Sequence, residues 1–165
     1  RITCRDVTGA LCANADFYAG AQAWESNWAE LFITVDMTKS TLVEGMVVVL
    51  NGQRLGHSPG NWIQNADLSW TDASSFRYAQ GNNTTTLYDH DLSLFYVNSV
   101  ATLDVEDPVV RLKFAKDLIG DNGEGPTGAI PAICIMGDAA SINAGAGNVG
   151  TGGAFAITGA VSTAP

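Results

Sequence analysis

Two carboxylates and a histidine stand together at residues 89–91, where the sequence is Asp-His-Asp. Alternate side chains of a β-strand share a face, so Asp89 and Asp91 would lie on one side and His90 on the other. Two carboxylates at this spacing could bind a calcium ion, at the surface or between subunits. The competing interpretation, which we favour, is a solvated strand start whose carboxylates face water.

A second cluster of calcium-type ligands lies in DNGEG, residues 121–125, through Asp121, Asn122 and Glu124. An EF-hand loop needs acidic ligands at positions 1, 3 and 5 and a glutamate at 12, and this segment lacks that spacing. A plain acidic turn is therefore the favoured interpretation. Calcium, at Asp89, Asp91 and Asp121, is the one candidate cofactor.

The sequence offers little for covalent or cofactor chemistry. It contains no G-x-S-x-G motif, and its only histidines are His57 and His90. GAGNVG at 145–150 matches the spacing G-x-G-x-x-G, but Thr-Gly-Gly and a strand pattern follow where a dinucleotide site needs a helix. We therefore predict that the protein is not an enzyme, and we rank a catalytic role third among the functions considered.

Two features of the sequence relate to sugars: tryptophans that could bind them and asparagines that could carry a glycan. Trp62, in the loop SPGNW, is the best candidate for stacking on a sugar ring. A place in the core or an interface is nevertheless favoured for all four tryptophans, which are Trp24, Trp28, Trp62 and Trp70. Asn82 and Asn83 each begin an N-x-T sequon in a predicted loop tip, where a glycan would be attached in a secreted protein.

Composition narrows the classes of partner. Charged residues make up 15% of the 165, against roughly 25% in an average protein, which suits a subunit covered by neighbours or a secreted β-domain. The net charge is −9 and the eight basic residues are scattered, which argues against nucleic-acid binding. No apolar run approaches the ~18 residues that a membrane span needs.

The three cysteines leave two interpretations open. Cys4 and Cys12 close a short loop and could form a disulfide in an exported protein, leaving Cys134 without a partner. Alternatively, all three are buried thiols that pack as small apolar groups. Their spacing fits no structural zinc site.

Strand patterns dominate after residue 30. ELFITVDM places Leu31, Ile33, Val35 and Met37 on one apolar face. MVVVL at 46–50 is typical of a strand buried on both faces, and Asn51-Gly52 follows as a tight turn. These features predict a hairpin over roughly 42–57.

Further strands are predicted along the rest of the chain. Residues 66–72, with Leu68 and Trp70 inward, and 75–80 are two of them. Residues 87–105 form either one strand bent near Asn98 or two strands. The last two are 108–116, with Val110, Leu112 and Phe114 on one face, and 129–137, with Pro131 at an edge or bulge. One short helix near 21–31 fits the spacing of Ala21, Trp24 and Trp28, and no other helix is expected. The pattern predicts an all-β fold, a single-domain β-sandwich or jelly roll over 1–138.

Residues 139–165 differ from this domain in composition. Residues 139–153 are rich in glycine and alanine and predict a flexible segment. In 154–165, the C-terminal strand, Phe155, Ile157 and Val161 share a bulky face and small residues share the other. Such a strand suits insertion into a narrow groove, either in its own sheet or in that of a neighbouring subunit.

Together these patterns favour a self-assembling structural subunit whose partners are copies of itself. It would form an extracellular or cell-surface filament, pilus-like fibre or tube, or a virion shell, held together by β-strand complementation. The alternative function is a secreted carbohydrate-binding or adhesive β-sandwich module that uses Trp62.

Overall fold

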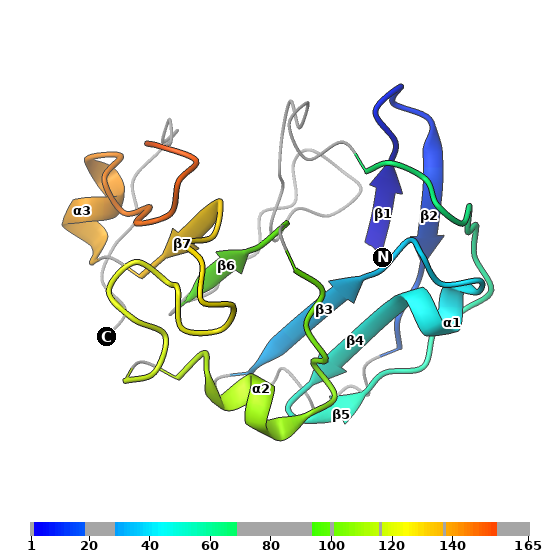
Figure 1. The fold of residues 1–165 in the computed structure, drawn as a ribbon, viewed down its shortest axis with the longest axis horizontal. Helices are drawn as coiled ribbons and strands as arrows, with labels where there is room; N and C mark the ends of the chain where they lie inside the picture. Colours follow the sequence, from blue (N-terminus) through cyan, green and yellow to red (C-terminus); the bar gives the residue numbers. More distant parts are fainter. Residues whose placement is uncertain are drawn as a thin grey trace. The chain divides into compact units, whose positions relative to one another are not determined.

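The computed structural model describes residues 2–18, 29–68, 94–99, 101–115, 117–136 and 138–154 (Figure 1). The chain divides into two compact units, each built from two pieces of sequence, and each unit is described by itself below. The first comprises Arg1–Ala73 and Thr102–Leu112, and the second comprises Ser74–Ala101 and Lys113–Pro165. Our expected boundary at residue 138 lies inside the second unit.

The first unit begins with an antiparallel hairpin of β1 (Ile2–Arg5) and β2 (Leu11–Ala15). The carboxylate of Asp6 organises the connecting turn, because it accepts hydrogen bonds from the backbone of Thr8 and Ala10 at 2.9 Å each. The Thr8 hydroxyl also donates to it, at 2.6 Å. These bonds, chiefly the one from the Thr8 side chain, hold the pKa of Asp6 below its usual value.

A second sheet of three antiparallel strands has the order β3-β4-β5, with bounds Leu31–Val35, Met46–Leu50 and Gln53–Arg54. The predicted hairpin is confirmed: Asn51 and Gly52 have φ values of 49° and 80° and join paired strands β4 and β5. The hairpin starts later than expected, because the single helical turn α1 (Leu42–Gly45) precedes β4. Thr41 caps that turn.

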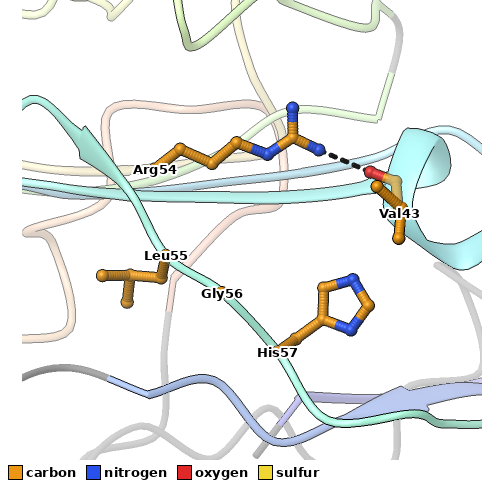
Figure 2. Close-up of a pocket in the computed structure, with 5 residues that line it drawn as sticks. All are labelled: Val43, Arg54, Leu55, Gly56 and His57. Carbon is orange, nitrogen blue, oxygen red and sulfur yellow. Dashed lines mark hydrogen bonds between the residues drawn. The ribbon is translucent and has the colours of Figure 1, made fainter.

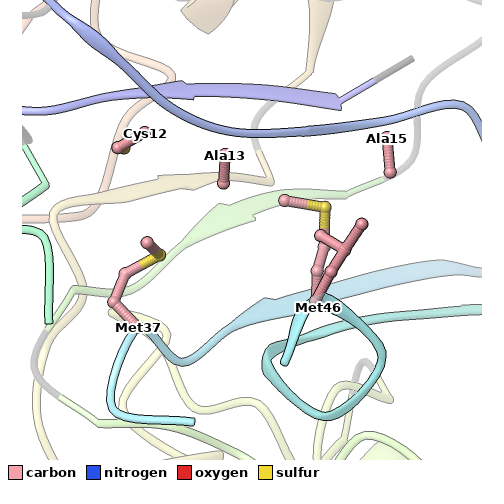
Figure 3. Close-up of a cluster of buried hydrophobic side chains, with 6 residues drawn as sticks. Cys12, Ala13, Ala15, Met37 and Met46 are labelled. Carbon is pink, nitrogen blue, oxygen red and sulfur yellow. The ribbon is translucent and has the colours of Figure 1, made fainter. Parts of the chain in front are cut away.

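Strand β4 is the centre of the unit, because every residue from Met46 to Leu50 is buried. This confirms the prediction of a strand covered on both faces. On one face, Met46 belongs to the first core cluster, in which the methionine side chains point toward β2 (Figure 3). The buried members of this cluster are Cys12, Ala13, Ala15, Met37, Leu42 and Met46. On the other face, Val47 and Val49 pack with Val105 in the second core cluster.

The apolar face predicted for β3 is covered over only part of its length. Val35 packs against the first core cluster and Met37 belongs to it. Leu31 and Ile33, on the same face, are 41% and 47% exposed. Phe32, on the opposite face, packs against the second core cluster. The strand is therefore as predicted, but its most apolar side is partly left open.

The strand predicted over 108–116 is wrong, since Pro108–Leu112 form the short helix α2. Asp107 and Pro108 explain the difference. The Asp107 carboxylate accepts a hydrogen bond from the backbone of Val109 at 2.8 Å, and proline suits the first position of a helix. Of the three residues in the alternating pattern, Leu112 is exposed and Val110 and Phe114 are half-buried, so they form no common buried face.

The second unit contains the antiparallel pair β6 (Phe95–Val97) and β7 (Ile133–Ile135). Strand β6 ends directly before Asn98, where a bend was predicted. The Tyr96 and Phe114 rings pack edge to face, with their centroids 5.0 Å apart. Helix α3 (Ala139–Asn143) begins at Asp138, whose carboxylate accepts from the Ser141 backbone at 2.7 Å. Helices α1, α2 and α3 correct the expectation that no helix follows residue 31.

Overall, the described part of the chain is broadly all-β, with small antiparallel sheets and a few short helices. None of the helices described in it is long and apolar enough to cross a membrane. Several predicted residues lie outside the described residues: Trp24, Trp28, Trp70, Asn82, Asn83, Asp89, His90, Asp91, Phe155, Ile157 and Val161.

Candidate functional site

The outer edge of β3 is the most distinctive surface of the first unit. Hydrogen bonds at both ends of the strand show which residues face β4: Asn51 donates to the Glu30 carbonyl at 2.9 Å, and Asp36 donates to the Gly45 carbonyl at 2.7 Å. Backbone groups alternate in direction along an antiparallel strand. Leu31, Ile33 and Val35 therefore point their N–H and C=O groups away from β4.

Nothing in the described part of the chain pairs with this edge. Strand β3 is the outermost strand of its sheet, and Leu31, Ile33 and Val35 make no backbone hydrogen bond to another segment there. Because Leu31 and Ile33 are also exposed, apolar side chains border the free backbone groups. An unpaired edge of this kind is a template for another strand.

Acidic residues bracket this edge. Glu30 precedes β3 and is exposed, and Asp36 directly follows the strand. The Thr38 hydroxyl and backbone donate to the Asp36 carboxylate at 2.6 and 3.0 Å. These bonds, helped by Lys39 at 3.8 Å, lower the pKa of Asp36 and keep it ionised at neutral pH.

A shallow hollow of about 340 Å³ lies beside β5 and is lined by Val43, Arg54, Leu55, Gly56 and His57 (Figure 2). Its charged group is already engaged, because the Arg54 guanidinium donates to Glu106 at 2.7 Å and to the Val43 carbonyl. His57 Nδ1 is 2.8 Å from the Ser58 carbonyl. The described residues that line the hollow include no serine, cysteine or carboxylate side chain.

Of the three aspartates predicted to bind calcium, Asp121 is the one that the structure describes, and it is exposed on its loop. The neighbouring Glu124 carboxylate accepts from the Asn122 backbone at 3.0 Å, so it braces the loop itself. Within the described ranges, no group of three or more His, Cys, Asp or Glu side chains is close enough to hold a metal. Asp89 and Asp91 lie outside those ranges, so the calcium site stays a prediction.

Trp62 packs inside the first unit. Its indole N–H donates to the Lys39 carbonyl at 3.0 Å, and its side chain packs against the first core cluster. Its six-membered ring lies directly against Gly45. This position agrees with the packing role that we favoured for the tryptophans, and sugar binding by Trp62 stays a prediction.

The cysteines of the structure are all free thiols, so Cys4 and Cys12 are not joined. Cys12 and Cys134 are fully buried, and Cys4 is partly buried against the first core cluster. Burial, together with the nearby Cys12, raises the pKa of Cys4 from 9.0 to about 11. These thiols are therefore protonated and unreactive at neutral pH.

We expect the stability of the protein to fall at alkaline pH because of Cys4. A raised pKa means that this thiol contributes its full stability below pH 9.0 and loses it as the pH rises toward 11. The expected loss is about 2 kcal/mol in the free energy of unfolding, measured by urea denaturation at each pH. The Cys4→Ala variant should lose less over this interval, and an equal loss in both proteins would contradict the assignment.

Segment 139–153, which was predicted to be flexible, is held by hydrogen bonds as far as Gly153. The Asn148 side chain accepts from the backbone of Cys134 and Gly150, at 2.8 and 3.0 Å. It also donates to the Gly153 carbonyl at 2.9 Å. Backbone bonds from Thr151 and Gly152 to residues 131 and 132 complete the anchor. Composition gave no sign of it, although asparagines among small residues, at 143 and 148, were a signal to examine.

Comparison of the chain with protein-family models, with curated proteins and with solved structures finds no match. Of the features described, the outer edge of β3 is the one that combines unpaired backbone groups with exposed apolar side chains.

Proposed function

We propose that this protein is a self-assembling structural subunit, in which a β-strand of one copy completes a sheet of the next. The observation that carries the proposal is the outer edge of β3, which pairs with no strand in the described part of the chain and has Leu31 and Ile33 exposed beside it. Main-chain hydrogen bonds to such an edge supply affinity, and alternate side chains supply specificity. Strand donation also covers an edge that would otherwise promote aggregation.

The donor in this proposal is segment 154–165, through the bulky face formed by Phe155, Ile157 and Val161. Its alternation of large and small residues supports this role, because a donated strand fills pockets with every second side chain. The small antiparallel sheets would then belong to a β-sandwich or jelly roll that a neighbour completes. The assembly would be an extracellular or cell-surface filament, pilus-like fibre or tube, or a virion shell.

Low charge supports the same proposal. Charged residues are 15% of the sequence, and a subunit covered by neighbours needs little charge to stay in solution. Exposed apolar residues that stand singly need no explanation, since most proteins have them. Leu31 and Ile33 differ because they are adjacent on one face of an unpaired strand.

Sugar binding through Trp62 is the weaker alternative. The indole N–H is already donated to Lys39, and the ring packs over Gly45. Glycan-array binding that disappears in the Trp62→Ala variant would favour this alternative, provided that the variant remains folded by circular dichroism.

The test compares the full chain with a chain that lacks 154–165, by negative-stain electron microscopy and sedimentation velocity. We expect polymers from the full chain and a folded monomer from the truncated one. A full chain that stays monomeric at every concentration would contradict the proposal. If 154–165 instead completes its own sheet, the full chain will be monomeric and the truncation will lower the melting temperature.

A further inference from the structure

We infer that the outer edge of β3 is the acceptor site for assembly, that its occupant is the uncharged segment 154–161 of a second copy, and that Glu30 and Asp36 prevent β3 from pairing with itself. This inference rests on the proposed function, because it names the acceptor of the same strand exchange. What it adds is the acceptor role of this edge for that segment and the guarding role of Glu30 and Asp36.

The site is a strand-sized surface. Leu31, Ile33 and Val35 each present an N–H and a C=O toward the outer side of β3, so six backbone groups there have no backbone partner among the described residues. Five residues of strand extend for about 17 Å, which is the length of a typical strand in a sheet. Side chains of an added strand would lie beside exposed Leu31 and Ile33 and cover them.

Charge argues against another β3 as the occupant. One two-fold antiparallel register pairs the whole of Leu31–Val35 with its copy, and it is centred on Ile33. In this register Glu30 of each copy stands directly opposite Asp36 of the other. Like charges opposite each other on paired strands are destabilising, and here the clash occurs twice. Charged residues that guard an edge in this way are a known means of preventing self-pairing.

Charge argues in favour of segment 154–161. No charged side chain occurs anywhere in residues 139–165, in a chain with 17 acidic and 8 basic residues. A strand from this region meets neither Glu30 nor Asp36 with a like charge.

The anchor at Asn148 defines where the donor begins. Because the Asn148 side chain holds the Gly153 carbonyl at 2.9 Å, the residues available for exchange are those that follow Gly153. Little slack precedes the donor strand, so two copies must come into close contact for the exchange. This favours a regular, directly packed assembly over one with loosely tethered subunits.

The first experiment measures binding of a fluorescein-labelled peptide of residues 154–165 to the chain that lacks them, by fluorescence anisotropy. We expect saturable binding that the Ile33→Lys variant weakens at least ten-fold. The matched control is Ile63→Lys, because Ile63 has nearly the same exposure, 49% against 47%, and lies outside β3. Binding that is equal in both variants would overturn the assignment of the β3 edge.

The second experiment tests the guarding role of the acidic pair. Glu30→Lys in the truncated chain turns both like-charge contacts into opposite-charge contacts, so we expect it to form a dimer that dissociates at high salt. The unsubstituted truncated chain should sediment as a monomer. A monomeric Glu30→Lys variant would overturn the guarding role.

The same variants separate this inference from the proposed function. If full-length Ile33→Lys still polymerises as the unsubstituted chain does, the acceptor lies elsewhere while strand donation survives. If the unsubstituted full chain forms no polymer at all, the proposed function itself fails.

Discussion

The Gly45→Ala variant will be destabilised by about 2–4 kcal/mol in its free energy of unfolding, the scale of severe overpacking in a core. Gly45 is the buried last residue of α1, and a Cβ there would overlap the six-membered ring of Trp62. The same Cβ would lie 2.8 Å from the Asp36 carbonyl oxygen. No real Cβ approaches backbone so closely, so the chain must shift.

Trp62 cannot easily move aside to make room. Its indole N–H is bound to the Lys39 carbonyl at 3.0 Å, and its ring packs on the first core cluster. The strain must therefore be taken up by α1 or by the strands around it. This is the physical reason for expecting a cost well above that of an ordinary glycine-to-alanine change.

Urea unfolding followed by circular dichroism measures the effect, with Gly56→Ala as the matched control. A Cβ at Gly56 meets no atom within 4 Å, and its backbone is not in the left-handed region. That control should be neutral or slightly stabilising. In a Trp62→Phe background, Gly45→Ala should cost less, because the overlapping ring atoms are gone. Equal stability of Gly45→Ala and Gly56→Ala would show that Trp62 packs elsewhere.

Local signals account for the parts of the fold that could be predicted. Asn51 and Gly52 adopt positive φ by their own chemistry, so the turn between β4 and β5 needed no knowledge of the rest of the chain. The unbroken apolar run Met46–Leu50 had to be buried on both faces. The pairing of β6 and β7 could not be predicted in the same way, although each strand lies within a segment predicted to be extended.

The parts that could not be predicted depend on distant residues or on competing local signals. Which side of β3 is covered depends on residues 103–105, about seventy positions away, where the Leu103 carbonyl accepts from Thr34 at 3.0 Å. At 108–112, the helix start at Asp107-Pro108 outweighed an alternating pattern of only three apolar residues. Alternating apolar residues therefore identified strand β3 correctly, but they could not show which residues cover it.

The candidate site shows the same limit. Alternation in 154–165 pointed to a donated strand, because the pattern lies within one segment. Its acceptor could not be predicted from the sequence. A strand edge can be recognised as free only when the pairing of every neighbouring strand is known. Leu31 and Ile33 looked like core residues, and only the register of β3 on β4 shows that their backbone groups face outward.

The Asn148→Ala variant will lower the free energy of unfolding by about 2–3 kcal/mol, because two backbone N–H groups lose their acceptor. The Asn148 amide accepts from Cys134 and Gly150 and donates to the Gly153 carbonyl, so one side chain closes the end of β7 onto the following segment. No water replaces it readily at the Cys134 backbone, since that residue is fully buried.

Chemical denaturation and native-state hydrogen exchange measure the loss, with Asn122→Ala as the control. Asn122 is exposed and uses its backbone, not its side chain, to bind Glu124, so this change should stay within about 0.5 kcal/mol. Exchange of the Cys134 and Gly150 amides should accelerate only in Asn148→Ala. Unchanged exchange there would contradict the anchor.

The Asn148→Ala variant also tests how the anchor affects assembly. Asn148→Ala alters neither segment 154–161 nor the outer edge of β3, so polymers should still form in the full chain. They should be less regular in electron micrographs, because the Gly153 carbonyl is no longer held and only the backbone bonds from Thr151 and Gly152 still anchor the segment before the donor strand. Complete loss of assembly in a variant that remains folded would show that the anchor itself, and not the strand beyond it, makes the contact between copies.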